Sequence, residues 1–134
     1  MKVMIDTNIF ISAALFPNGR SAAALMKSLR PPFEAEICDY VIDELHRKFQ
    51  EKFPDKAVEL EAFLYAILQS MEFIKTPEGE LAEECLIRDV KDRPILRAAL
   101  NENVDLFLTG DKDFLESTVR DPKIISVNEF LEKY

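Results

Sequence analysis

The chain has 134 residues, a formal net charge of −8, and 48% hydrophobic and 31% charged residues. This length predicts one domain, residues 1–134, that buries its own core without disulfide or metal staples. No apolar run approaches the ~20 residues that a membrane helix needs. Asp6 and Asn8 interrupt the first apolar stretch, which excludes a signal-peptide pattern there. We therefore expect a cytoplasmic protein without a membrane partner.

The acidic balance argues against broad attraction to nucleic acid, because phosphates are bound through Lys and Arg. It leaves room for a metal-dependent protein, since two bound Mg²⁺ would change the formal charge from −8 to −4. Cys38 and Cys85 have neither metal-ligand nor disulfide-framework spacing, so we expect reduced, mostly buried thiols. With His46 as the one histidine, a zinc site is not expected.

Strands and helices alternate along the chain, which predicts an α/β fold with a mainly parallel sheet. Breaks containing Pro, Gly or Asn separate the elements of the first half. These elements are a strand at 3–6, helices at 9–16 and 21–29, a strand at 33–38, a helix from 39 and a helix at 57–71. The last two helices, joined by a short connection, predict a helical hairpin packed on the sheet.

The second half continues the alternation after one irregular segment. Residues 77–88 are rich in acids and have no clear hydrophobic period. The predicted elements are a strand at 73–76, a helix from 92 with Pro94 in its first turn, a strand at 104–108, a short helix at 114–119, a strand at 124–125 and a helix from 128.

Four acids fall where the predicted strands end or the following helices begin. Asp6 and Asp111 follow strands, Asp92 begins a helix, and Glu44 lies in the second turn of another helix. Right-handed crossovers between parallel strands bring such ends to one edge of the sheet, where ligands bind in open α/β folds. These positions predict an acidic site at that edge.

Converging carboxylates need a proton or a cation. Two of them about 4 Å apart repel by roughly 4 kcal/mol at an effective dielectric constant near 20, so one is protonated or a cation binds. Carboxylate oxygens suit Mg²⁺ or Mn²⁺. One or two such ions could activate a water and stabilise the leaving oxygen of a phosphodiester.

Each polar residue also has a plainer interpretation. The three aspartates could be helix caps, and Glu44 could be a solvated helix residue. Asn8 and Thr109 could bond to turn backbone. The joint placement of the acids at one predicted edge favours a site over four separate roles.

Four segments, residues 3–10, 41–45, 89–100 and 106–114, resemble in this order the PIN-domain nucleases, especially the VapC-like toxins of prokaryotic toxin–antitoxin pairs. The resemblance covers nearly the whole chain. It implies a three-layer α/β/α sandwich around a mainly parallel central sheet. It also implies an endoribonuclease that hydrolyses phosphodiester bonds of single-stranded RNA with Mg²⁺ or Mn²⁺.

The resemblance also assigns residues to the site. The implied catalytic, metal-binding acids are Asp6, Glu44, Asp92 and Asp111, and the residues that would orient them are Asn8, Thr109 and Asp113. For Asp113, and for Asp89, a solvated or capping acid is the alternative. The family usually has Ser or Thr before the helix of Glu44, where this chain has Cys38 followed by Asp39.

Basic residues close to these acids are candidates to hold RNA phosphates. Arg93 and Lys112 are the main candidates, beside Arg88 and Lys91. Their alternative is a surface role, balancing neighbouring acids on the helices.

The family further implies a homodimer and a cognate antitoxin protein. The net charge of −8 supports an alternative, a PIN-like module that binds RNA or protein without hydrolysis. A receiver domain or a metal phosphatase would need a further acid near Asp6, and position 8 is Asn. The three glycines form no phosphate-binding loop, so no nucleotide cofactor is expected.

Overall fold

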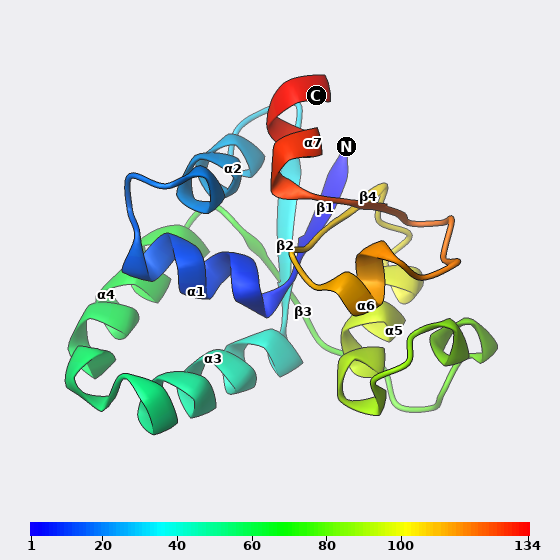
Figure 1. Cartoon of the computed structure of the whole chain (residues 1–134), viewed down its shortest axis with the longest axis horizontal. Helices are drawn as coiled ribbons and strands as arrows, with labels where there is room; N and C mark the ends of the chain where they lie inside the picture. The colour runs from blue at the N-terminus through cyan, green and yellow to red at the C-terminus, as the bar shows by residue number, and fades with distance from the viewer.

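A computed structural model of the chain describes residues 1–134 and contains one sheet of five parallel strands (Figure 1). The strand order across the sheet is β3-β2-β1-β4-β5. The strands are β1 (Lys2–Ile5), β2 (Glu34–Cys38), β3 (Glu72–Ile74), β4 (Leu106–Leu108) and β5 (Lys123–Ile125). The predicted α/β class with a parallel sheet is confirmed.

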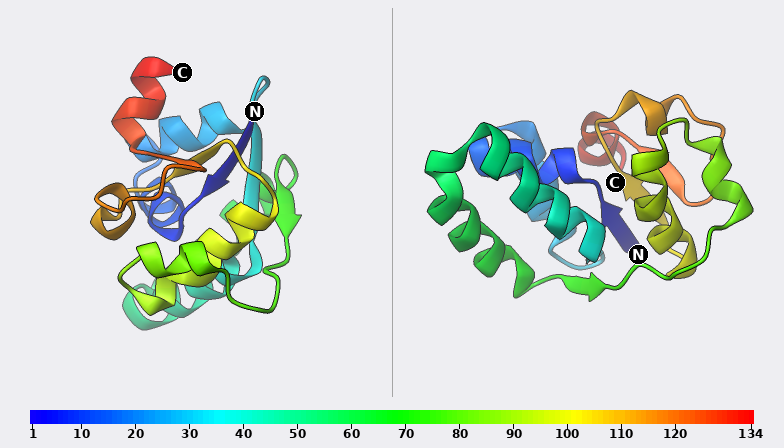
Figure 2. Two further views of the ribbon diagram at one scale, coloured as in Figure 1. Left: turned by 90° about the vertical axis from the view of Figure 1, so that its right-hand side faces the viewer. Right: turned by 90° about the horizontal axis from the view of Figure 1, so that it is seen from below.

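Helices cover both faces of this sheet and make the predicted three-layer α/β/α sandwich. Figure 2 shows α1 to α4 on one side of β1 and α5 on the other, and α7 packs against α2. The helices are α1 (Thr7–Leu15), α2 (Arg20–Ser28), α3 (Asp39–Lys52), α4 (Ala57–Leu68), α5 (Arg93–Asn101), α6 (Lys112–Leu115) and α7 (Val127–Lys133), with 3₁₀ turns η1 (Pro54–Lys56), η2 (Ala82–Leu86) and η3 (Val90–Asp92).

The central strands are buried on both faces, as expected of a parallel sheet between helical layers. Val3, Met4 and Ile5 of β1 have no exposed surface, and they belong to a core of 31 buried hydrophobic residues. Among the helices, the apolar stripe of α3 supplies Val41 and Leu45 to this core. No helix of the chain has the length and apolar character required to cross a membrane.

The order of the strands creates a reversal point beside β1. The chain passes from β1 outward to β2 and β3, and then returns to β4 on the other side of β1. The backbone N–H of Asp6 donates to the Leu108 carbonyl at 3.0 Å, which ties the two strand ends together. A crevice outside the carboxyl ends of strands at such a reversal is the usual ligand site of open α/β sheets. Both chain termini lie at the opposite end of the sheet (Figure 1).

Three local predictions are wrong. The short helix is α6 at Lys112–Leu115 rather than 114–119, because the Asp111 carboxylate accepts the Asp113 N–H and starts the turn earlier. Cys38 is buried as expected, but Cys85 is exposed in η2. Helix α4 ends at Leu68, three residues before the predicted end at 71.

Candidate active site

Asp6 lies at the centre of the reversal point, directly after β1. Its side chain is buried, with 3% of the residue exposed. One carboxylate oxygen accepts the Thr7 N–H at 2.8 Å, and the other accepts the Thr109 hydroxyl at 2.7 Å. The carboxylate therefore caps α1 and also faces the neighbouring strand end, so the capping and site interpretations hold together.

Thr109 connects Asp6 to the loop that follows β4. Its hydroxyl donates to Asp6 and accepts the backbone N–H of Asp111 at 3.0 Å. The Asp111 carboxylate accepts the Asp113 N–H at 2.9 Å and so caps α6. The fully buried Thr109 thus holds two of the predicted acids in a defined relation.

A second group of acids lies beside this pair. Carboxylate oxygens of Asp89, Asp92 and Asp113 all lie within 4.8 Å of one another. Asp89 caps η3 by accepting the Lys91 N–H at 3.0 Å. Asp92 makes no side-chain cap bond to α5, so its interpretation as a cap is wrong. Asp89, which the sequence left open between a cap and a site residue, is therefore both a cap and a member of the tightest acid group.

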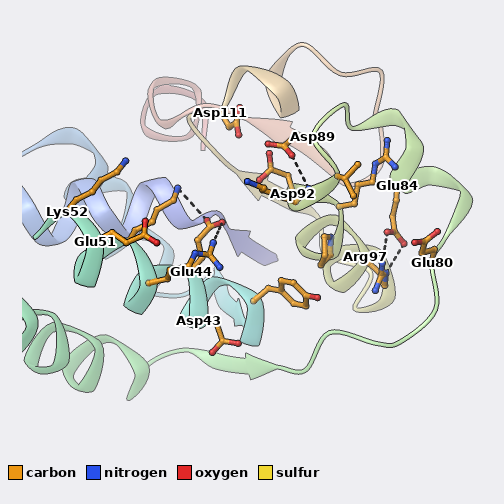
Figure 3. Close-up of a pocket in the computed structure, with 17 residues that line it drawn as sticks. Asp43, Glu44, Glu51, Lys52, Glu80, Glu84, Asp89, Asp92, Arg97 and Asp111 are labelled. Carbon is orange, nitrogen blue, oxygen red and sulfur yellow. Dashed lines mark hydrogen bonds and ion pairs between the residues drawn. The ribbon is translucent and has the colours of Figure 1, made fainter. Parts of the chain in front are cut away.

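Glu44 faces these acids from the opposite side. Helix α3 carries it at the wall of a cleft of about 1110 Å³, whose other wall includes Asp89 and Asp92 (Figure 3). Asp111 lines the same cleft. Three of the four predicted acids thus line one cleft, and Asp6 is buried at the strand end.

Burial, with a further contribution from neighbouring negative charges, raises the pKa values of two carboxyl groups of the site. Burial raises the pKa of Asp6 from 3.8 to about 6, although the hydrogen bonds from Thr109 and Thr7 oppose the shift. Burial also raises the pKa of Asp92 to about 7, and the charges of Asp6 and Asp111 contribute in the same direction. The acids are therefore close enough to disfavour one another's ionised forms.

The remaining predicted residues occupy different surroundings. Arg93 lines the cleft, and its Nε donates to the Ile87 carbonyl at 2.9 Å. Lys112 is exposed on α6 and is not part of the cleft lining. Asn8 is exposed and makes no hydrogen bond to the acids. Arg88 pairs with Asp113 at 2.7 Å, and Lys91 lines the cleft.

At the start of α3, where the PIN-domain nucleases usually have Ser or Thr, a neighbouring residue replaces the missing hydroxyl. Cys38 occupies the N-cap position and makes no side-chain cap bond. Asp39 in the first turn accepts the N–H of Tyr40 at 3.0 Å and both the N–H and the hydroxyl of Thr76. This carboxylate therefore anchors the start of α3 to the chain that follows β3, and Glu44 keeps its place on the helix.

The donor set fits a hard divalent cation. All the converging groups are carboxylates, which suit Mg²⁺ or Mn²⁺ rather than a thiolate-preferring metal. The raised pKa values of Asp6 and Asp92 have a common partial cause in the neighbouring negative charges. A cation bound among them would remove that repulsion.

The model of the PIN domain family matches residues 2–113. The chain therefore belongs to the PIN domain family. A search of the curated proteins found no relative of the chain.

Two solved structures have a similar fold. One is VapBC2 from Rickettsia felis bound to a DNA fragment from its promoter, with 21% identity, a TM-score of 0.67, and coverage of 94% of this chain and 97% of that chain. The other is Mycobacterium tuberculosis VapC20, a Sarcin-Ricin loop cleaving toxin, with 15% identity, a TM-score of 0.60, and coverage of 85% and 93%. Both likenesses extend over most of the two chains compared.

Proposed function

We propose that the chain is an Mg²⁺- or Mn²⁺-dependent endoribonuclease that cuts single-stranded RNA and acts as the toxin of a toxin–antitoxin pair. The observation that carries this proposal is the buried Asp6 carboxylate, held by Thr7 and Thr109 beside the other acids. Membership of the PIN domain family and the fold shared with a Sarcin-Ricin loop cleaving toxin support it.

The residues that would hold the cation are Asp6, Glu44, Asp92 and Asp111, with Asp89 and Asp113 beside Asp92. A bound divalent ion supplies an activated water and stabilises charge on the leaving oxygen of a phosphodiester. Thr109 orients the Asp6 carboxylate by donating its hydroxyl hydrogen, and this bond opposes the rise in the Asp6 pKa that burial causes.

No side-chain nucleophile is required in this arrangement. The single histidine, His46, has its ring nitrogens bonded to the Ile42 carbonyl and to Glu61. It lines a different pocket, between α3 and α4. Water activated at the acidic cleft is therefore the nucleophile that the arrangement favours.

For the substrate, Arg93 has the better position of the two main candidates because it lines the cleft and Lys112 does not. For the partner, the likeness to a structure of VapBC2 supports a cognate antitoxin that covers this chain. The homodimer remains part of the proposal as the assembly that the family implies.

The test is cleavage of a labelled single-stranded RNA by the purified chain in Mn²⁺ or in EDTA. We expect cleavage in Mn²⁺ alone, and a loss of at least about 100-fold in Asp6→Asn, since the loss of a metal ligand costs no less than that of a supporting residue. Asp43→Asn is the matched control, because this exposed acid lines the cleft outside the proposed ligand set.

The same protein distinguishes the alternative of a binding module. RNA binding without cleavage, together with no heat of Mn²⁺ binding in a calorimetric titration, would favour the module. Cleavage that survives in EDTA would contradict metal dependence.

A further inference from the structure

Helix α3 forms one wall of the cleft and carries a row of basic side chains that have no role in the function proposed above. Arg47, Lys48 and Lys52 all line the cleft, on the same helix as Glu44. They lie three, four and eight residues after Glu44, which are spacings that keep residues on one face of an α-helix. The row therefore follows α3 along the cleft on the C-terminal side of Glu44.

Two of these cations are paired with Glu44. Arg47 Nη2 lies 3.6 Å from one Glu44 oxygen, and Lys48 Nζ lies 3.7 Å from the other (dashed at Glu44 in Figure 3). Glu44 is the sole ion-pair partner of both. The Arg47 side chain is 60% exposed and the Lys48 side chain 30%, whereas that of Glu44 is 16% exposed. Both cations are thus at the surface of the cleft with their charge balanced by a proposed metal ligand.

The opposite wall also carries basic side chains, namely Lys91, Arg93 and Arg97. Arg97 is bound to Glu84 through two hydrogen bonds of 2.8 Å, and Arg93 donates its Nε to a backbone carbonyl. In total, the lining has eight acidic and six basic side chains. Without a cation, acidic side chains therefore outnumber basic ones along the cleft.

We propose that Arg47 and Lys48 are phosphate-binding residues for the RNA strand, and that Glu44 masks them until it binds a cation. The inference rests on the proposed function and adds residues that hold the substrate. A carboxylate that shares its charge with a divalent ion balances its former partners less, so the two side chains become free to bind phosphates. Cation and RNA then each strengthen the binding of the other, as linkage requires.

The masking can be tested in EDTA, where no cation is bound and no metal-dependent cleavage occurs. The probe is a fluorescently labelled single-stranded oligouridylate, with affinity measured by anisotropy at low ionic strength. Glu44→Gln removes the mask. We expect it to tighten binding about fivefold, the effect of releasing two exposed ion pairs. The slope of log K against log salt should also steepen by about 1.4, corresponding to two more phosphates neutralised on a single strand.

Glu51→Gln is the matched control. Glu51 lies on the same helix and lines the same cleft but makes no ion pair, so this substitution gives an identical change of charge. We expect a gain of less than about twofold from it, through screened long-range repulsion.

A variant that lacks both basic side chains tests whether the effect of Glu44→Gln depends on its ion pairs. In Arg47→Ala/Lys48→Ala, the effect of Glu44→Gln should fall to that of Glu51→Gln, because nothing is left to unmask. Equal effects of Glu44→Gln and Glu51→Gln in the natural background, or a fivefold gain that survives the alanine pair, would overturn the inference.

The outcomes also separate this inference from the proposed function. Manganese-dependent cleavage by the natural chain, with no difference between the two glutamine variants in EDTA, overturns the inference alone. RNA that no variant binds, with or without Mn²⁺, overturns both.

Discussion

The Thr109 hydroxyl donates to the Asp6 carboxylate across the reversal point of the sheet, over a distance of 2.7 Å. The two residues follow β1 and β4, which are adjacent strands although 103 residues separate them in sequence. The same hydroxyl accepts the Asp111 N–H. One buried oxygen atom therefore aligns the two strand ends that carry acids into the site.

Thr109→Val removes this hydroxyl while keeping the shape of the side chain. Asp6 then loses a donor that lowers its pKa, and the Asp111 N–H loses its acceptor. We expect Mn²⁺ affinity to fall about 10- to 100-fold, the usual cost of losing a group that orients a metal ligand. Calorimetric titration with Mn²⁺ measures the effect. Thr118→Val, at an exposed position, is the control and should bind Mn²⁺ as the natural chain does; unchanged affinity in Thr109→Val would contradict the role.

Much of this arrangement could be predicted from the sequence because it depends on strand ends. A buried strand followed by an acid places the acid at the sheet edge whatever the later packing, as Asp6 and Asp111 both do. The parallel sheet and its helical layers follow from the alternation of elements and are confirmed.

Asp89 was harder to assign because its position depends on tertiary contacts. The preceding segment has no hydrophobic period and is held by Glu84, which bonds Arg97 of α5, and by the Ile87 carbonyl, which accepts from Arg93. These contacts join residues across an irregular loop, and no local pattern encodes them. The signal that the sequence offered was the place of Asp89 in the segment 89–100, which resembles the PIN-domain nucleases.

Asp6→Asn should stabilise the metal-free chain while it removes metal-dependent cleavage. The folded chain raises the pKa of Asp6 from 3.8 to about 6, so above pH 6 the ionised carboxylate costs stability that a neutral amide does not. We expect a gain of about 1–3 kcal/mol in the free energy of unfolding at pH 8. Urea denaturation in EDTA measures it. Mn²⁺ should stabilise the natural chain and leave the variant unchanged. A destabilised Asp6→Asn would show that the α1 cap outweighs the repulsion.

The surroundings of Glu36 predict that the stability of the chain depends on pH through a group outside the cleft. It lies in β2 with 1% of its side chain exposed, and neither carboxylate oxygen has a hydrogen-bond partner. Lys2 Nζ is 4.0 Å away. Burial raises its pKa from 4.5 to about 7, although Lys2 opposes the shift. The folded chain therefore keeps a proton that the unfolded chain releases, and stability should fall as pH rises from about 4.5 to 7.

The measurement is urea denaturation at pH 5 and pH 8. Asp6 and Asp92 contribute with the same sign, so the informative quantity is the difference between variants. Glu36→Gln should lose about 2–3 kcal/mol of the stability change between the two pH values. Glu34→Gln, at the exposed start of the same strand, is the control and should keep nearly all of it. Equal pH dependence in the two variants would assign the effect to the cleft acids alone.

Arg97→Ala should be the most destabilising single change near the cleft. Glu84 is 2% exposed and receives two hydrogen bonds from Arg97, which lowers the pKa of Glu84 below its usual value. Removing Arg97 leaves a buried carboxylate without its ion-pair partner and with only the Leu81 N–H as a donor. Breaking a buried pair in this way costs about 3–5 kcal/mol. Replacing both partners, as in Glu84→Leu/Arg97→Leu, should cost less, because no buried charge remains.

Urea denaturation of these variants measures the cost, with Arg20→Ala as the control for an exposed arginine. Arg20 contacts Glu132 at 3.8 Å with both side chains more than half exposed, so its loss should cost under about 1 kcal/mol. The segment that leads to Asp89 and Asp92 depends on the buried pair, so Arg97→Ala should also weaken Mn²⁺ binding, and Arg20→Ala should not. If Arg97→Ala is no more costly than Arg20→Ala, the pair does not hold this wall of the cleft, and the position of Asp89 must depend on the Arg93 contact with Ile87 instead.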